Sequence, residues 1–441
     1  MVSGMNPSGI NTDQMIRQLM YIERQPLRNM EKDKKEVNNK IDAWQKINTS
    51  LDTLKNKTED IEGIFDEMST SSNDEGIATA SADPSATTGD YNINIDQLAK
   101  SHRVRSDDNL AADYTLDNDG QFEVSVDGKS SAVNVNAGDS LNDVANAINN
   151  QAVDGDGNQL AEATVVDNQL VIEGSKTGNA NALSLKDTTN KPLENLGVID
   201  NNDVIQHQIQ GAQDAQFDLN GITDITSSSN TVDDVVNGMS FNLKDTGSTT
   251  ITVNNNSEAM KEKIQSFVDQ YNSVQDKFEK YGGKESVLQG DSSLRGLESN
   301  LYGSAINPVE GLGLDKNTLS LVGIDVNNDG SLSVNDSELE ENLNNNLSEV
   351  KQLFLGNESN PDKGIANRIK NEVEMATDTF DGYVSGKIDS LESQVDWIEE
   401  DMTNLERRLE LREERLNQKF SRMERSISQM QNQQSWLSSQ L

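Results

Sequence analysis

The chain has 441 residues, enough for two to four domains, and its hydrophobic content of 33% and aromatic content of 4% are low for a globular enzyme. It carries 37 Lys and Arg residues against 75 Asp and Glu residues, a formal net charge of −38. This acidity argues against nucleic acid and against an anionic membrane surface as partners, because both attract basic surfaces. The chain has no Cys, which excludes disulfides, thiolate metal sites and a Cys nucleophile.

Helix is expected at the N-terminal end, from about Thr12 to Met68. The residues "NTD" offer an N-cap, and apolar residues then recur every three or four positions, as in an amphipathic helix or a coiled coil. Pro26 is expected to kink or restart this helix. Residues 69–90 are rich in Ser, Thr, Ala and Gly, which indicates a linker or an extended edge.

The middle of the chain changes to a period of two. Stretches such as "YNINIDQLA", "QFEVSVDG" and "QLVIEGS" alternate apolar and polar residues between Gly and Asn turns, which predicts β-structure. One helix is expected at "DSLNDVANAINN", with Leu141, Val144 and Ile148 on one face. Two short echoes, of "QFEVSV" in "AQFDLN" and of "SLNDVANAIN" in "TVDDVVNGMS", favour two related β-rich modules.

Helical spacing returns at Ser257. A long helix is expected first, then short helices near 291–303 and 336–355, with a hairpin around 318–334 between them. A very long helix ends the chain, with apolar residues at strict three- and four-residue steps from Ile388 onward.

Sustained heptads of this kind indicate a coiled coil. Arg412 breaks the apolar seam and Leu416 resumes it. The predicted fold class is therefore α+β, with helical N- and C-terminal ends that form coiled-coil or helical-bundle legs and β-rich domains inserted between them.

The charge follows the same division. Residues 16–46 hold eight basic and five acidic residues, and residues 401–441 hold seven and six. Residues 71–250 hold eight basic and 29 acidic residues. The ends and the middle are therefore expected to face different surroundings. Solubility in a salty medium is the ordinary explanation of such acidity, and a cation-binding surface is the alternative.

The sequence "DVNNDGSLSVND" is the main candidate for a metal site. Asp325, Asn327 and Asp329 match the first half of a calcium-binding loop, but the twelfth position is Asp336 rather than Glu, and "TLSLVGI" before it reads as strand. The alternative, which we prefer, is a β-turn between two short strands. The acidic "DGDGN" at 154–158 is likewise interpreted as a loop rather than a metal site.

Catalysis has little support in the sequence. The two histidines, His102 and His207, lie far apart in polar stretches, and the chain has no P-loop, no GxGxxG and no HExxH motif. No enzyme, no catalytic residue, no cofactor and no metal site is expected.

An ordered set of segments resembles one known family. These segments are "SGINTDQMIRQLMYIERQPL", "YNINIDQLAKSH", "FVDQYNSV", "GIDVNNDGSLSVNDSELEENL" and "FSRMERSISQMQNQQSWLSSQL". They look like five segments of the flagellar filament-capping family, hook-associated protein type 2. In the same order, these are the opening helix, a strand ending in Gln-Leu-Ala, the start of the C-terminal region, a segment with a structural Asp-Gly-x-Leu, and the terminal helix. Residues 134–187 resemble a short repeat of hook and flagellin proteins, and Thr226 stands near a position where the family usually carries Arg.

The resemblance implies a cap at the extracellular tip of the bacterial flagellum. Several copies would form a homo-oligomeric ring with helical legs, guide exported flagellin subunits into place and prevent their leakage. Export would use the flagellar type III apparatus, which fits an N-terminus without a Sec signal. The implied partners are flagellin, the hook–filament junction proteins, a flagellar export chaperone and surface glycans, with no membrane insertion.

The expected domains follow from these observations. They are an N-terminal leg at 1–40 that pairs with 405–441, a bundle segment and linker at 41–90 that pairs with 256–404, acidic β-rich head domains at 91–255, a helical bundle with a small hairpin at 256–404, and a C-terminal leg at 405–441.

Apolar residues near the two chain ends are the candidate partner interface. They are Ile16, Leu19, Leu27, Met30, Phe420, Met423, Ile427, Met430 and Leu437. Our hypothesis is that both ends are weakly ordered alone and fold against flagellin and neighbouring cap subunits. Met-rich faces adapt to varied partners. An ordinary intramolecular helical hairpin is the alternative. For the whole protein, the alternatives are another secreted filament or junction component, and a surface adhesin that uses the acidic β domains.

Overall fold

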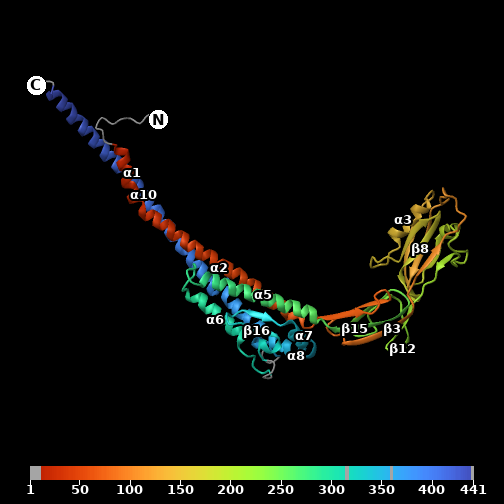
Figure 1. Cartoon of the computed structure of the whole chain (residues 1–441). Helices are drawn as coiled ribbons and strands as arrows, with labels where there is room; N and C mark the ends of the chain where they lie inside the picture. The colour runs from red at the N-terminus through yellow and green to blue at the C-terminus, as the bar shows by residue number, and fades with distance from the viewer. Residues whose placement is uncertain (1–10, 313–316, 358–360, 439–441) are drawn as a thin grey trace. The chain divides into compact units, whose positions relative to one another are not determined.

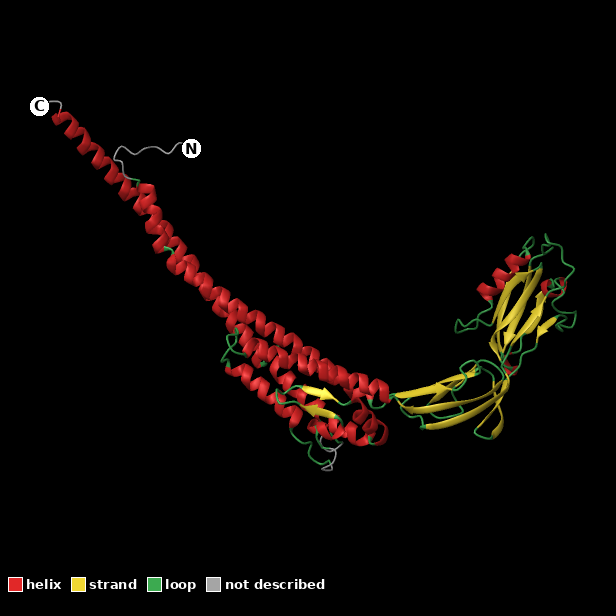
Figure 2. Cartoon of the chain, viewed as in Figure 1, coloured by secondary structure: helices red, strands yellow, loops and turns green. Residues whose placement is uncertain are grey.

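The computed structural model describes residues 11–312, 317–357 and 361–438. By its internal contacts the chain divides into a helical unit, formed by Met1–Phe65 with Ser257–Leu441, and a β-rich unit, formed by Asp66–Asn256. Figure 1 colours the chain by residue number, and Figure 2 distinguishes its helices from its strands. The predicted α+β class, with helical ends around a β-rich middle, is confirmed.

The helical unit is built around one long helix, α2, which lies beside α5, α9 and α10. The described elements of this unit are α1 (Thr12–Glu23), α2 (Gln25–Ile64), α5 (Ser257–Gly282), α6 (Ser292–Ile306), the 3-10 turn η2 (Leu319–Val322), β16 (Ile324–Val326), β17 (Leu332–Val334), α7 (Asp336–Asn345), α8 (Leu347–Leu355), the 3-10 turn η3 (Pro361–Lys363), α9 (Ile365–Thr377) and α10 (Tyr383–Ser438).

The core of the helical unit follows the three- and four-residue spacing of its helices. Trp44, Leu51 and Leu54 of α2 are fully buried, and they pack in one cluster with Phe267 and Tyr271 of α5. Burying large apolar side chains on one face of each helix is the main source of stability for such a bundle.

The direction of each neighbouring helix is set by contacts along α2. The side-chain amide of Gln270 in α5 donates to the carbonyl oxygen of Ser50 at 2.8 Å. Lys55 pairs with Glu374 of α9 at 3.3 Å, and Lys34 pairs with Glu399 of α10 at 2.5 Å. Residue numbers in α9 and α10 rise as those in α2 fall, so α9 and α10 follow each other along α2 in the antiparallel sense.

The sequence predicts that Pro26 kinks or restarts the N-terminal helix, and in the structure a new helix begins there. Helix α1 ends at Glu23 and α2 begins at Gln25, with the proline in its first turn, where a missing N–H costs nothing. The helix was expected to reach Met68, but α2 ends at Ile64, because Met68 already pairs as the first residue of a strand.

The β-rich unit has two hydrophobic cores. The first lies between a five-stranded antiparallel sheet, in the order β1, β15, β3, β11, β12, and a three-stranded sheet, in the order β13, β14, β2. Its strands are β1 (Met68–Ser72), β2 (Ala78–Ala82), β3 (Gly89–Gln97), β11 (Ala215–Leu219), β12 (Ile222–Ser227), β13 (Thr231–Val232), β14 (Met239–Leu243) and β15 (Gly247–Asn255).

The second core lies between a four-stranded sheet, in the order β10, β4, β8, β7, and a three-stranded sheet, in the order β6, β5, β9, with α3 packed against them. Its elements are β4 (Ser101–Arg105), β5 (Gly120–Val126), β6 (Lys129–Val135), α3 (Leu141–Gln151), β7 (Ala161–Val166), β8 (Gln169–Thr177), the 3-10 turn η1 (Asn179–Asn181), β9 (Ser184–Thr189), α4 (Pro192–Asn195) and β10 (Gln208–Gln210).

The chain enters and leaves the β-rich unit at one place. Strands β1 and β15 are antiparallel neighbours in which Met68 lies opposite Asn255. One residue further out, the backbone N–H of Asn256 donates to the carbonyl oxygen of Glu67 at 3.0 Å. The β-rich unit is therefore an insertion whose two ends are held together.

Two further sequence expectations can be compared with the structure, and the second of them is wrong. Of the two possibilities for residues 69–90, the extended edge is correct, since β1 and β2 fall there and each ends its sheet. The echo at 231–240 does not repeat the helix at 141–151: it forms β13 and a turn, because Val232 pairs with Phe241 of β14.

Candidate functional site

The two ends of the described chain pair with each other through an apolar seam. Ile16 and Met20 of α1 are buried in one apolar cluster with Leu405, Leu409 and Leu416 of α10, and Leu27 and Met30 of α2 pack against it. The N-cap is in place, because the side chain of Asn11 accepts a hydrogen bond from the N–H of Gln14. Figure 1 shows α1 lying alongside α10.

Polar contacts flank this seam at three levels. The hydroxyl of Thr12 donates to Glu424 at 2.5 Å, Glu23 pairs with Arg412 at 3.1 Å and Arg24 pairs with Glu413 at 3.2 Å. Each ion pair is partly solvated and contributes about 0–1 kcal/mol, so the seam supplies most of the affinity and the pairs fix the register. Arg412, which interrupts the apolar pattern in the sequence, is thus the partner of Glu23.

The structure distributes the nine predicted interface residues over three environments. Ile16 is buried in the seam; Leu27, Met30, Phe420, Met423 and Ile427 are partly buried; Leu19, Met430 and Leu437 are exposed. Helices α1 and α10 cover each other within the chain, in the arrangement that the alternative of an intramolecular helical hairpin describes. Weak order of these ends in the isolated protein stays a prediction, and so does their contact with a partner.

One stripe of α10 is covered in its first half and open in its second. Leu409, Leu416, Met423, Met430 and Leu437 recur at intervals of seven residues, so they lie along one line of a coiled-coil helix. The first two are buried in this seam, and Met423 is partly buried. Met430 is 59% exposed and Leu437 is 57% exposed. The stripe that holds α1 therefore continues for two heptads past Glu424.

A second apolar stripe lies on the outer side of α1, and sequence reasoning named only one of its residues, Leu19. Met15, Leu19 and Ile22 are spaced by four and three residues, and they are 39%, 40% and 63% exposed. Ile16 and Met20 take the inner side instead. The spacing of Met15, Leu19 and Ile22 was visible in the sequence, but the sequence alone does not say which of the two stripes faces α10.

The candidate calcium loop is a β-hairpin, in agreement with the preferred alternative. Strands β16 and β17 pair in antiparallel register, with Val326 opposite Leu332. In the turn, Asp329 accepts hydrogen bonds from the N–H and the hydroxyl of Ser331 at 3.0 and 2.7 Å. These two bonds hold the pKa of Asp329 below its ordinary value. Asn335 then caps α7.

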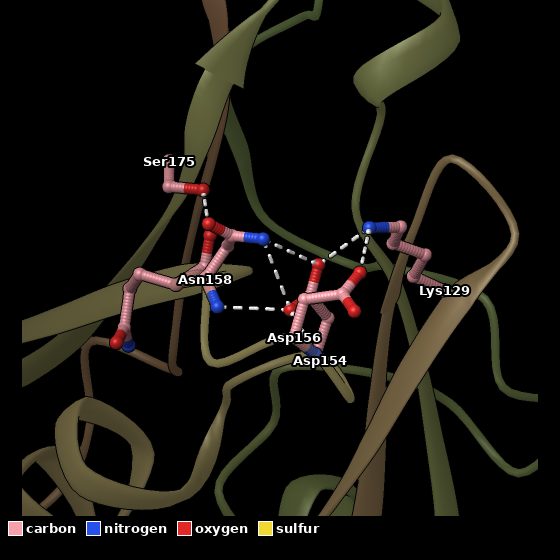
Figure 3. Close-up of polar contacts among 6 residues, drawn as sticks. Lys129, Asp154, Asp156, Asn158 and Ser175 are labelled. Atoms are coloured by element: carbon pink, nitrogen blue, oxygen red, sulfur yellow. Dashed lines mark hydrogen bonds and ion pairs between the residues drawn. The ribbon is translucent and has the colours of Figure 1, made fainter.

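The "DGDGN" loop is closed by a lysine of a neighbouring hairpin, as Figure 3 shows. The ammonium group of Lys129 donates to Asp154 at 2.6 Å and to Asp156 at 3.3 Å. Asp154, which is 8% exposed, also accepts from the N–H groups of Asp156 and Asn158 at 3.0 and 2.8 Å. The lysine, and after it these N–H groups, hold the pKa of Asp154 well below its ordinary range. The ammonium group of Lys129 thus pairs with both carboxylates of the loop, in the place where a bound metal ion would otherwise neutralise them.

His102 is a structural residue of the β-rich unit. It is 6% exposed, its Nδ1 accepts from the N–H of Leu183 at 3.0 Å, and its Nε2 lies 3.3 Å from the side-chain oxygen of Gln208. This arrangement selects the tautomer with a proton on Nε2. Across residues 11–312, 317–357 and 361–438, no three His, Asp or Glu side chains gather as metal ligands would.

None of the helices in the described part of the chain is long and apolar enough to cross a membrane.

Comparison with known families gives matches at both ends of the chain. A family model described as the C-terminus of flagellar hook-associated protein 2 matches residues 212–432, which is half of the chain. A model described as the N-terminus of flagellar hook-associated protein 2 matches residues 8–102.

Individual proteins give the same result. The A-type flagellar hook-associated protein 2 of Pseudomonas aeruginosa is 27% identical over 432 residues, which cover 89% of this chain and 87% of that protein. Flagellar hook-associated protein 2 of Aeromonas caviae is 26% identical and covers 74% of this chain and 72% of its own length. The fold resembles a crystal structure of the D1, D2 and D3 domains of the flagellar cap protein FliD from Escherichia coli, with a TM-score of 0.66, 23% identity and coverage of 79% of this chain and 99% of that one.

Proposed function

Because the chain belongs to the flagellar hook-associated protein 2 family and is a flagellar filament cap, we propose that it works as a homo-oligomeric scaffold that guides exported flagellin into the filament. In this role it directs the insertion and folding of flagellin subunits at the extracellular tip and prevents their leakage. Filament elongation and motility then depend on it. The family is one of structural proteins, and the proposed role needs no catalytic step.

One observation supports flagellin contact in particular: the heptad stripe of α10 that α1 covers only in part. A stripe that binds a helix between Leu405 and Leu416 offers the same surface to a second helix around Met430 and Leu437. We propose that a terminal helix of flagellin or of a neighbouring cap subunit takes this place.

The contact must be made and broken as each subunit is added. The open part of the stripe supplies two exposed apolar anchors, Met430 and Leu437, rather than a large buried core. Such a small contact gives modest affinity and fast release, and methionine adapts to partners of varied shape. The outer stripe of Met15, Leu19 and Ile22 gives a second surface of the same kind.

The experiment uses a strain without its own cap gene, complemented with variants of the full chain. Met430→Ser with Leu437→Ser is expected to leave short filaments in electron micrographs and monomeric flagellin in the medium. Leu411→Ser is the matched control, because Leu411 is a 52% exposed residue of the same helix and lies off the stripe. If the double variant capped filaments as well as the control did, the stripe would not be the contact.

Export through the flagellar type III apparatus, with an export chaperone that covers the apolar stripe before export, completes the proposal. The chain is then expected in the medium of a normal strain and inside the cells of a strain without a functional export apparatus. Secretion in both strains would exclude this route.

A further inference from the structure

The turn between α9 and α10 carries the most exposed large apolar side chain of the described residues, Phe380, which is 94% exposed. The turn itself is fixed from within. One carboxylate oxygen of Asp378 accepts from the N–H of Phe380 at 2.8 Å and from the N–H of Asp381 at 2.9 Å, and the N–H of Gly382 donates to the carbonyl oxygen of Asp378 at 3.0 Å. A Cβ at residue 382 would come within 2.3 Å of that oxygen, so the turn requires glycine.

We call residues 378–382, the turn between α9 and α10, the tip. Because these hydrogen bonds already order the tip, it can present the Phe380 ring to a partner at little cost in conformational entropy. The tip is also acidic. The carboxylate of Asp378 accepts hydrogen bonds from two backbone N–H groups, and these bonds, first that from Asp381 and then that from Phe380, lower the pKa of Asp378. Within the described residues, neither Asp378 nor Asp381 has a cationic partner.

A groove between α2 and α5 has the opposite character. It has a volume of about 300 Å³ and is lined by Lys46, Thr49, Ser50, Thr53, Gln270, Ser273 and Lys277. The polar groups along its floor already have partners: Thr49 and Thr53 donate to backbone carbonyls of their own helix, and Gln270 donates to Ser50. Lys46 and Lys277 form no ion pair with the carboxylates that the structure describes. The groove therefore holds two ammonium groups without a carboxylate partner among the described residues, and that of Lys277 donates one hydrogen bond, to the hydroxyl of Ser273 at 3.2 Å.

The acidic tip and the basic groove lie at the same level of the helical unit. Lys55 contacts Glu374 before the tip, and Lys34 contacts Glu399 after it. At one residue per 1.5 Å along each helix, both contacts put the tip near Ser50 of α2. Ser50 is also the residue that Gln270 of the groove contacts.

The tip and the groove nevertheless face different sides. Lys55, on the α9 side, and Ser50, on the α5 side, are five residues apart, which corresponds to about 140° around α2. One subunit can therefore hold two neighbours, one at each side, without a shift along the helix axis. Two different complementary patches on one subunit form a head-to-tail contact, which closes into a ring when the rotation allows it.

We propose that the Phe380 tip of one subunit seats in the α2–α5 groove of a second copy of this chain. The phenyl ring lies between Lys46 and Lys277, where cation–π attraction adds to its burial, and Asp378 and Asp381 meet the two ammonium groups. This inference rests on the proposed oligomeric cap, and it names the contact that joins neighbouring subunits.

The first test compares the mass of purified full-length variants by analytical ultracentrifugation. Phe380→Ala is expected to lower the share of assembled protein at least tenfold and to leave the melting temperature unchanged, because the ring contacts almost nothing within its own subunit. Trp397→Ala is the control, since Trp397 is 70% exposed in the same unit and lies away from the tip. Lys46→Glu with Lys277→Glu is expected to match Phe380→Ala. Assembly of Phe380→Ala at the wild-type level would overturn the inference.

The second test uses the absence of Cys from the chain. A variant with both Asp381→Cys and Lys277→Cys is expected to form a ladder of disulfide-linked species on oxidation, because each subunit joins two neighbours. Asp381→Cys with Glu406→Cys is the control pair and is expected to stay unlinked. A single dimer band, or no band, would overturn the head-to-tail contact.

A third readout separates this inference from the proposed function. If Phe380→Ala assembles normally but loses flagellin binding, the tip seats on flagellin and the inference is wrong. If Phe380→Ala caps filaments fully in the complemented strain, the inference also fails, while the proposed function stands. If a strain without the cap gene leaks no flagellin, the proposed function itself fails.

Discussion

Thr12 donates a hydrogen bond of 2.5 Å to Glu424, although 412 residues separate them along the chain. This bond lies where α1 begins, and beyond it α10 continues to Ser438. Among residues 11–312, 317–357 and 361–438, it is the last hydrogen bond that α1 makes along α10, and the exposed Met430 and Leu437 lie beyond it. The paired part of α10 should respond to mutations through the stability of α1, whereas the exposed part should respond through the binding of a partner.

Truncating the seam should release α1 from α10. Ile16→Ala removes a buried side chain and is expected to cost about 2 kcal/mol of local stability. Amide hydrogen exchange of residues 12–23 should accelerate more than tenfold, while the core around Trp44 keeps its protection because it belongs to a separate cluster. Met15→Ala is the control, since Met15 lies on the outer side of the same helix. Equal acceleration in both variants would contradict the assignment of inner and outer sides.

Removing the buried histidine should weaken the β-rich unit. His102→Ala leaves the N–H of Leu183 buried without its acceptor, which is expected to cost about 1–3 kcal/mol. Urea unfolding followed by circular dichroism measures this loss. Tryptophan fluorescence should stay unchanged, because Trp44, Trp397 and Trp436 all lie in the helical unit.

The control for this variant is His207→Ala, which removes the chain's other histidine. The backbone carbonyl of His207 accepts from Arg105, and that bond survives the change. If both variants unfolded at the same urea concentration, the role of the His102 ring would be wrong.

The Lys129–Asp154 contact should make the β-rich unit sensitive to acid. Because the folded pKa of Asp154 lies below its unfolded value, the folded state binds fewer protons there than the unfolded state does. The contact therefore stabilises the unit fully above about pH 4, the ordinary range of an Asp carboxyl, and loses this contribution as the pH falls further. Asp154→Asn should flatten this acid dependence, measured as the unfolding midpoint between about pH 6 and pH 2.

Asp156→Asn is the matched change in the same loop. The side chain of Asp156 is 78% exposed and accepts from Lys129 at the longer distance of 3.3 Å, so Asp156→Asn should change the unfolding midpoint less than Asp154→Asn does. The reverse order of the two variants would contradict the geometry of the loop.

Calcium should leave the hairpin at 324–334 unchanged. The carboxylate of Asp329 is already held by Ser331, and the side-chain amide of Asn327 donates to the Ser331 hydroxyl at 2.9 Å. Addition of calcium or of a chelator should not move the melting temperature of the helical unit. A rise of several degrees with calcium would show that the loop opens to bind the ion.

The sequence predicted the longest helices from their apolar spacing. The stretches around Trp44, Tyr271 and Leu391 each present one apolar face, and each is buried in the core of the helical unit. Helix α9 has the same spacing, with Ile365, Ile369 and Val373, but it was missed because the chain around it carries weaker signals.

The pattern failed where it carried little hydrophobic contrast. Strands β1 and β2 consist of Ser, Thr, Ala and one Met, so pairing with β14 and β15 rather than alternation decides their structure. The "TLSLVGI" stretch was read as strand, but its first part forms the 3-10 turn η2. Gly323, at φ 91°, then redirects the chain into β16, and no side chain fits there because a Cβ would lie 2.6 Å from the N–H nitrogen of Leu339.

The sequence could identify the apolar residues of the candidate interface, but it could not tell which of them are buried and which are exposed. The heptad positions Leu416, Met423 and Met430 look equivalent in the sequence, yet the first is buried and the last is 59% exposed. In the described part of the chain, the difference follows from the register between two distant segments, which places Thr12, the first residue of α1, beside Glu424.

The closed neck of the β-rich unit, where Met68 faces Asn255 and Glu67 binds Asn256, has a consequence for how such a protein diversifies. The segment between these residues can be replaced by a smaller or larger one without changing the distance between the point where the chain enters the β-rich unit and the point where it leaves. The β-rich unit can therefore change in size and surface while the helices of the other unit stay as they are.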